Sequence, residues 1–192
     1  MNQARAIWMI VLGVVVAGIC SFSARPGAVE DKYVKAGLLL DKNRFAEALV
    51  VYEEILTTDA PLEDKKKSRV FNNLGFCYYQ LNDLEKAREY YGKALDLDRN
   101  YSVCLNNLSV VLMNQKKYEE ALPCLNQAYG VEKNIKVIFN LFVTHYYLDH
   151  RKEALAYIEE ALRLDEAYTQ DRLKKKNVSQ RDIERLKKYV KG

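Results

Sequence analysis

The stretch FNNLGFCYYQLNDLEKAREYYGKALDLDRNY, residues 71–101, contains a pattern that most of the chain repeats. A step of 34 residues carries Leu74-Gly75 onto Leu108-Ser109. A third copy follows with one residue fewer in its turn, and a looser copy precedes. Their matching residues are Leu141, His145, Arg151, Ala154, Ile158 and Ala161 in the third, and Ala36, Leu39, Phe45, Ala48, Tyr52 and Ile55 in the looser copy. A period of this length is typical of stacked helical repeats.

Small residues recur where two helices would have to approach closely. Gly75 and Ser109 lie on the first helix of their repeats, and Ala87 and Ala121 on the second. A small side chain lets two packed helices come together, and apolar residues at three- and four-residue spacing fill the seam around it. Asp83 stands in the turn, where its carboxylate can accept hydrogen bonds from the free N–H groups of the second helix.

These units resemble the tetratricopeptide repeat, a helix-turn-helix unit with this period and these small and bulky positions. The resemblance implies an all-α fold, a right-handed α-solenoid over residues 31–168, with repeats at about 29–61, 68–101, 102–134 and 135–168. Helices are expected at about 31–41, 44–57, 68–81, 84–97, 102–114, 118–131, 135–148 and 151–164. The polar segment 58–67 is predicted to be either a surface loop or an extended start of the next helix. With only 3 Pro and 8 Gly, the composition also favours helices over sheet.

An uncharged stretch runs over residues 6–24. Its length lies between that of a signal peptide and that of a spanning helix of roughly 20 residues. Three fates are open for residues 1–24: an uncleaved transmembrane anchor, a signal peptide cleaved best after Ser23, or a lipoprotein signal with Cys20 lipidated. For a bacterial source, all three predict a protein of the cell envelope, either anchored in the inner membrane and facing the periplasm, or periplasmic or a lipoprotein after cleavage.

A short linker is predicted at residues 25–30. The seven residues from Ala24 to Glu30 reach at most about 25 Å when extended. The repeats would therefore stay near the bilayer unless cleavage frees them.

The end of the chain, residues 169–192, is predicted to be a basic capping helix or tail. Residues 171–192 hold nine Lys or Arg and three acidic residues, so the rest of a chain of net charge +4 is slightly acidic. Residues 179–182 resemble a capping box, and apolar residues then follow on one helix face: Ile183, Leu186 and Val190. A terminal helix that packs on the last repeat explains this pattern. The alternative is attraction to anionic lipid or nucleic acid.

The sequence contains no Gly-rich phosphate loop, CxxC, HExxH or Gly-x-Ser-x-Gly motif. The chain is therefore predicted to be non-enzymatic, without cofactor or metal. His145 and Asp149 are one helical turn apart, but a metal site needs three or four ligands, and His145 occupies a packing position of its repeat. Cys77 and Cys104 are predicted to be small buried hydrophobes or, in an exported protein, a disulfide.

Binding is predicted in a concave groove, which the first helix of each pair lines in stacked repeats. An asparagine recurs at one equivalent position, and its amide can donate to and accept from the backbone of an extended peptide. A hydrogen bond within the chain is the alternative role for this amide. The predicted groove residues are Tyr33, Asn72, Asn73, Phe76, Tyr79, Gln80, Asn106, Asn107, Val110, Met113, Asn114, Lys136, Phe139, Asn140, Val143, Tyr146 and Tyr147.

We therefore expect a non-enzymatic protein–protein interaction scaffold, membrane-anchored or exported, that binds a partner peptide or helix in this groove. The alternative is a self-associating structural component of a membrane-associated complex. Some proteins of the resembled family bind a C-terminal carboxylate with Lys and Arg. Only Asn73 fits that pattern here, and the positions where much of the basic set would be are occupied by Tyr33, Gly37, Val103 and Asn107. Capture of that kind is not expected, and neither is a nucleic-acid partner.

Overall fold

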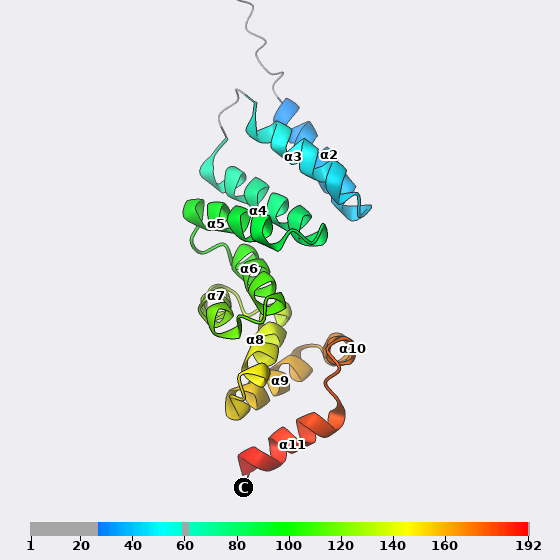
Figure 1. Ribbon diagram of the computed structural model, residues 1–192, viewed down its shortest axis with the longest axis vertical. Helices are drawn as coiled ribbons and strands as arrows, with labels where there is room; N and C mark the ends of the chain where they lie inside the picture. The colour runs from blue at the N-terminus through cyan, green and yellow to red at the C-terminus, as the bar shows by residue number, and fades with distance from the viewer. Residues whose placement is uncertain (1–26, 59–61, 192) are drawn as a thin grey trace, which may run out of the picture.

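The computed structural model describes residues 27–58 and 62–191. These residues form ten helices and no strand (Figure 1), which confirms the predicted all-α fold. Residues 1–24 with Cys20, linker residues 25 and 26, and the side chain of Val190 lie outside the described part. Residues 28–30, predicted as linker, form the first turn of a helix instead. Among the helices that the structure describes, none is both long and apolar enough to span a membrane.

Four helix pairs follow one another along the chain, and two further helices close the C-terminal end (Figure 1). The pairs are α2 (Ala28–Asp41) with α3 (Phe45–Leu56), α4 (Asp64–Gln80) with α5 (Leu84–Leu97), α6 (Ser102–Asn114) with α7 (Tyr118–Val131), and α8 (Ile135–Tyr147) with α9 (Arg151–Leu164); the last two are α10 (Glu166–Lys175) and α11 (Gln180–Lys191). The bounds of α5, α6, α7 and α9 coincide with those expected from the sequence. Helix α4 begins earlier than expected, so part of the segment 58–67 is an extended helix start.

The turn inside a pair both ends one helix and begins the next. Asn82 adopts a left-handed backbone conformation with φ of 63°, and the N–H of Asp83 donates to the carbonyl oxygen of Tyr78 at 2.9 Å, which satisfies a carbonyl at the end of α4. The Asp83 carboxylate then accepts from the N–H of Lys86 at 3.1 Å and caps α5. The predicted role of Asp83 is confirmed.

The predicted close approach of paired helices is confirmed by burial and by distance. Gly75, Ser109, Ala87 and Ala121 are all buried. A Cβ atom placed on Gly75 would lie 2.8 Å from the ring of Tyr91 on α5, closer than real Cβ atoms come to a neighbour. The absence of a side chain at Gly75 therefore lets the Tyr91 ring pack directly on the α4 backbone.

The first helices of successive pairs form the inner side of the stack. Helices α4, α6 and α8 contact each other in succession, and each also packs on its own partner and on the preceding pair. Helices α3, α5, α7 and α9 lie on the outer side. This arrangement places the residues predicted to bind a partner on one side of the molecule.

The C-terminal segment forms two helices instead of the single capping helix that was expected. Helix α10 ends before Asn177, which has a φ of 55°, and both helices pack on α9. Ile183 and Leu186 of α11 are buried in the same core cluster as α8 and α9. This packing agrees with the predicted capping role for the face that carries these two residues.

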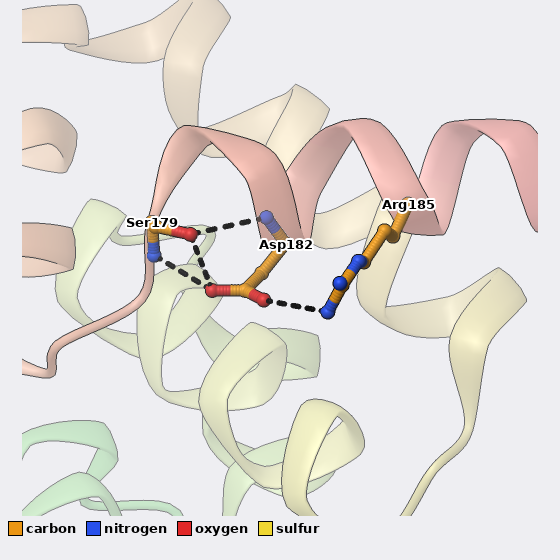
Figure 2. A network of polar contacts seen from close by, with 3 residues as sticks. All are labelled: Ser179, Asp182 and Arg185. Carbon is orange, nitrogen blue, oxygen red and sulfur yellow. Dashed lines mark hydrogen bonds and ion pairs between the residues drawn. The ribbon is translucent and has the colours of Figure 1, made fainter.

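The predicted capping box starts α11. The Ser179 hydroxyl lies 3.3 Å from the N–H of Asp182, which donates to it, and the Asp182 carboxylate accepts from the Ser179 N–H at 3.0 Å. Figure 2 shows this reciprocal pair, together with Arg185 at 3.9 Å from the same carboxylate.

Candidate interaction surface

Side-chain amides link the inner helices to one another. The Asn73 amide donates to the hydroxyl of Tyr52 at 2.9 Å and to that of Tyr33 at 3.3 Å, which ties α4 to both helices of the preceding pair. Asn72 donates to Asn73 at 3.2 Å and accepts from Asn107 of α6 at 3.1 Å. The amides therefore form a continuous chain of hydrogen bonds across three successive inner helices.

A second link of this kind joins α6 to α8. The amide of Asn140 donates to the side-chain oxygen of Asn106 at 2.8 Å. The recurring asparagine thus makes hydrogen bonds within the chain at all three of its positions, Asn73, Asn107 and Asn140. This is the alternative role given above for its amide. Its amide at Asn107 remains half exposed, so that position also faces the inner surface.

Replacement of Asn73 with alanine is expected to lower the free energy of unfolding by about 1 kcal/mol, because the buried Tyr52 hydroxyl loses its hydrogen-bond partner. Burial raises the pKa of this hydroxyl above its ordinary value, so Tyr52 stays neutral and still needs a partner. Urea unfolding followed by circular dichroism measures the change. The matched control is Asn114→Ala, since Asn114 is exposed and its bond to the Tyr79 hydroxyl lies at the surface; an equal loss in both variants would contradict the assignment.

Five of the predicted groove residues are buried and do not line an open surface. They are Asn72, Met113, Phe139, Asn140 and Val143, with exposed fractions between 0% and 6%. Successive inner helices lie so close that the side chains between them are covered, and the C-terminal helices cover the last of them. The prediction that these five residues face a groove is wrong.

The open part of the inner face lies mainly over α4 and α6. Gln80, Asn114 and Lys136 are exposed, and Tyr33, Asn73, Phe76, Tyr79, Asn106, Asn107 and Val110 are half-buried. Val103, at the start of α6, adds an apolar side chain that is 50% exposed. Amides, aromatic rings and aliphatic groups therefore alternate on a surface supported by two packed helices.

Tyr146 and Tyr147 lie apart from this surface, at the end of α8. They line a cleft of about 350 Å³ together with Asp182, Arg185 and Leu186 of α11. The ring of Tyr147 stacks on that of Tyr118 with centroids 4.9 Å apart. The structure thus divides the predicted site between the inner face and the edge of the cap.

Charge is distributed unevenly between the outer helices and the inner helices α4, α6 and α8, whereas the first inner helix, α2, contains Glu30, Asp31 and Asp41. After Asp64 at its first residue, α4 contains no carboxylate, and α6 and α8 contain none at all. Each of the outer helices α3, α5, α7 and α9 contains two or three. Arg69 and Lys136 are exposed on the inner helices, so the part of the inner side formed by α4, α6 and α8 carries positive charge.

Sequence reasoning missed Arg172 of α10. Its guanidinium carbon lies 5.7 Å from the centre of the Phe139 ring. The sequence contains a signal for this residue in its repeat spacing. A step of 33 residues leads from Asn106 to Phe139, and a second step of 33 leads to Arg172. The repeat pattern therefore continues into the tail, and α10 places Arg172 at the end of the inner row.

The two histidines lie together between α8 and α9. The Nδ1 atoms of His145 and His150 are 3.2 Å apart, and the ring of His145 stacks on Tyr157. Asp149 pairs instead with Arg151 at 2.6 Å. Within the described ranges, no group of three or more His, Cys, Asp or Glu is placed to hold a metal ion.

Acidification below the ordinary histidine pKa is expected to destabilise the fold. Burial and the nearby His150 lower the pKa of His145 below its ordinary value of 6.5, while Glu153 opposes the shift. Below pH 6.5 the unfolded chain takes up a proton that the folded chain binds only at lower pH, so stability is lost as the pH falls. Urea midpoints measured from about pH 8 to about pH 5 test this. A smaller decline in His145→Gln is expected, and an identical decline in that variant would contradict the role of His145.

Cys77 and Cys104 are buried free thiols. Burial raises the pKa of the Cys77 thiol to about 12, and the Cys104 thiol donates to the carbonyl oxygen of Tyr91 at 3.4 Å. Both side chains are part of the packed core between the pairs.

Two segments of the chain match models of the tetratricopeptide repeat, residues 68–101 and 103–129. The chain is 26% identical over 113 residues to the ycf37 protein of Porphyra purpurea, a match that covers 57% of this chain and 65% of that one. It is 31% identical over 85 residues to the type IV pilus assembly protein PilF of Pseudomonas aeruginosa, covering 44% of this chain and 32% of that one. It is 33% identical over 73 residues to the protein MJ0572 of Methanocaldococcus jannaschii. This match covers 38% of this chain and 85% of that one. The chain thus spans less than two thirds of the length of the first two relatives.

Solved structures of the same repeat share the fold. MamA from Desulfovibrio magneticus RS-1 has a TM-score of 0.66 at 18% identity, and the match covers 85% of this chain and 91% of that one. YrrB, described as a TPR protein with an unusual peptide-binding site, has a TM-score of 0.59 at 20% identity and covers 73% and 71%. The chain belongs to the tetratricopeptide repeat proteins, a class of helical scaffolds that are typically not enzymes.

Proposed function

We propose that this chain is a non-enzymatic interaction module that binds an extended segment of a partner protein across the inner face of α4 and α6. The observation that carries this proposal is the open surface there. Amides at Asn107 and Asn114 can pair with a peptide backbone, and Phe76, Tyr79 and Val110 offer apolar contact for its side chains.

The rigidity of this surface supports binding. The amide chain from Tyr52 through Asn73 and Asn72 to Asn107 fixes the spacing of the inner helices. A surface that is already in place loses little conformational freedom when a partner binds, so more of the contact energy appears as affinity. YrrB, which shares the fold, is described as a TPR protein with a peptide-binding site. This description also supports the proposal that the present chain binds a peptide segment.

The test uses a library of random twelve-residue peptides displayed on phage and selected on the full chain. Selected peptides are synthesised with a fluorescent label, and their affinity is measured by anisotropy. The double variant Tyr79→Ala with Asn114→Ala removes a hydrogen-bonded pair, at 2.9 Å, that bridges two inner helices. We expect it to weaken binding about tenfold or more, because both an aromatic contact and an amide are lost.

A matched control removes a similar pair on the outer side. The Tyr129 hydroxyl donates to the Glu160 carboxylate at 3.1 Å and bridges α7 to α9. The double variant Tyr129→Ala with Glu160→Ala should leave affinity unchanged. If no peptide is selected, or if the two double variants weaken peptide binding equally, the inner face is not the binding site.

We also propose that residues 6–24 place the repeats in a bacterial cell envelope, as an inner-membrane anchor or as an export signal. The support is the uncharged stretch itself, which precedes the described helices by a short linker. Mass determination of the native N-terminus separates the retained, cleaved and Cys20-lipidated forms. An intact N-terminus on a protein found only in the soluble fraction would contradict both forms of the proposal.

Self-association through α2 is a second candidate function, and one observation favours it. Leu38 is 55% exposed, although the residues at its position in the next three inner helices, Cys77, Val111 and Thr144, are fully buried. Val34, one turn earlier, is also 55% exposed. Sedimentation velocity of the full chain in nonionic detergent should then show a dimer that Leu38→Lys dissociates. A monomer at all concentrations would exclude this function.

A further inference from the structure

Arg172 is a fixed cation that forms no ion pair with any residue in 27–58 or 62–191. Its Nε atom is buried and makes no hydrogen bond within the part of the chain that the structure describes. Its guanidinium lies over the Phe139 ring, which holds the group in place by a cation–π contact. The Arg172 side chain as a whole is only half-buried, and its terminal nitrogens are not among the buried atoms that lack partners.

Two further cations lie along the same helices. Lys136 precedes Phe139 by one turn of α8, and Lys176 follows Arg172 by one turn at the end of α10. Burial and the neighbouring Arg172 lower the pKa of Lys176, as is usual for cations held together without a counter-charge. Other basic residues of the cap do have partners, for example Lys175 with Asp171 at 2.7 Å.

We infer that the partner segment is acidic, and that one of its Asp or Glu carboxylates binds Arg172 with support from Lys136 and Lys176. A partly buried cation is costly unless it is paired, and the fork of a guanidinium matches a carboxylate in geometry. Because this inference rests on the proposed inner-face function, it specifies the charge of the partner and the position of its anchor.

The part of the inner face formed by α4, α6 and α8 agrees with an acidic segment. From Lys65 to Tyr147 the inner helices contain no carboxylate that would repel such a partner. Arg69, near the start of α4, is exposed. A segment laid across α4 and α6 would therefore meet a positive side chain at Arg69 and a positive site at Arg172.

The peptides selected on the full chain provide the test. We expect Asp and Glu to be enriched at least about twofold over the unselected library. Arg172→Gln and Lys136→Gln should each weaken binding about tenfold, the effect of losing one hydrogen bond to a charged group. Arg88→Gln is the matched control, because Arg88 is exposed on the outer helix α5 and should leave affinity unchanged.

A second measurement ties the carboxylate to Arg172. Peptides in which the critical Asp or Glu is replaced by Asn or Gln should bind the chain about tenfold more weakly. The Arg172→Gln variant should bind these changed peptides no more weakly than the unmodified chain does, since the two changes remove one shared contact. Lys136→Gln keeps the test valid if Arg172→Gln does not fold, because the Lys136 side chain is exposed.

The outcomes separate this inference from the proposed function. Peptides that bind through Tyr79 and Asn114 but are neutral, or are indifferent to Arg172→Gln, overturn the acidic anchor and leave the inner-face function standing. No peptide binding at all overturns both. Vesicles with phosphatidylglycerol that bind the chain through Arg172 and displace the peptides would assign these cations to a lipid headgroup instead, and would overturn the inference.

Discussion

Replacement of Phe142 with alanine is expected to lower the free energy of unfolding by about 3 to 5 kcal/mol. Phe142 is fully buried in α8, and its ring centre lies 5.7 Å from that of Phe139 and 5.8 Å from that of Tyr146. Nine consecutive residues of α8, from Val137 to His145, are buried. Other helices surround α8 closely, so the structure has little freedom to collapse into the space that the ring leaves.

Urea unfolding of the full chain, followed by far-UV circular dichroism, measures this loss. Phe142→Leu is the control, and it should cost less than about 1.5 kcal/mol because the volume is nearly kept. A loss below about 1 kcal/mol for Phe142→Ala would show that the last pair relaxes around the gap, contrary to the dense packing of α8.

Replacement of Gly75 with serine is expected to cost about 1 to 3 kcal/mol through overpacking. Any side chain at Gly75 would lie too close to the ring of Tyr91, which is 1% exposed and packed in the core. Serine has a higher helix propensity than glycine, which offsets part of the cost but not a contact of this kind.

The next repeat suggests the rescue. There, Ser109 of α6 stands at the position of Gly75, and Leu125 of α7 at the position of Tyr91, and both are fully buried. The double variant Gly75→Ser with Tyr91→Leu copies this pair and should be at least about 1 kcal/mol more stable than the sum of the single effects predicts. Simple additivity in this double-mutant cycle would show that the two residues do not limit each other.

The fold could be predicted closely because its determinants are local. The small residues at Gly75, Ser109 and Ala87 fix where helices touch, and Asp83 marks where one helix begins. These signals lie within one repeat, and their recurrence makes each one a check on the others.

The candidate site was predicted less well because exposure depends on distant elements. Spacing assigned Phe139 and Asn140 to the inner side of α8, but it gave no measure of how much α6 and α10 cover them. Likewise, the break at Asn177 turned the expected single terminal helix into two, and this brought Arg172 onto the Phe139 ring. Side chains that meet across elements far apart in sequence leave only weak periodic traces, such as the 33-residue step to Arg172.

The two ends of the stack differ, and this difference limits the assemblies that the molecule can build. The C-terminal end is closed by α10 and α11, whereas the N-terminal end leaves Leu38 of α2 uncovered. Contact between two uncovered ends is two-fold symmetric and self-limiting, because both molecules use the same surface and the contact buries it on each of them. Head-to-tail growth into a filament would instead require the uncovered face of α2 to match a surface at the C-terminal end, where α10 and α11 cover the last pair.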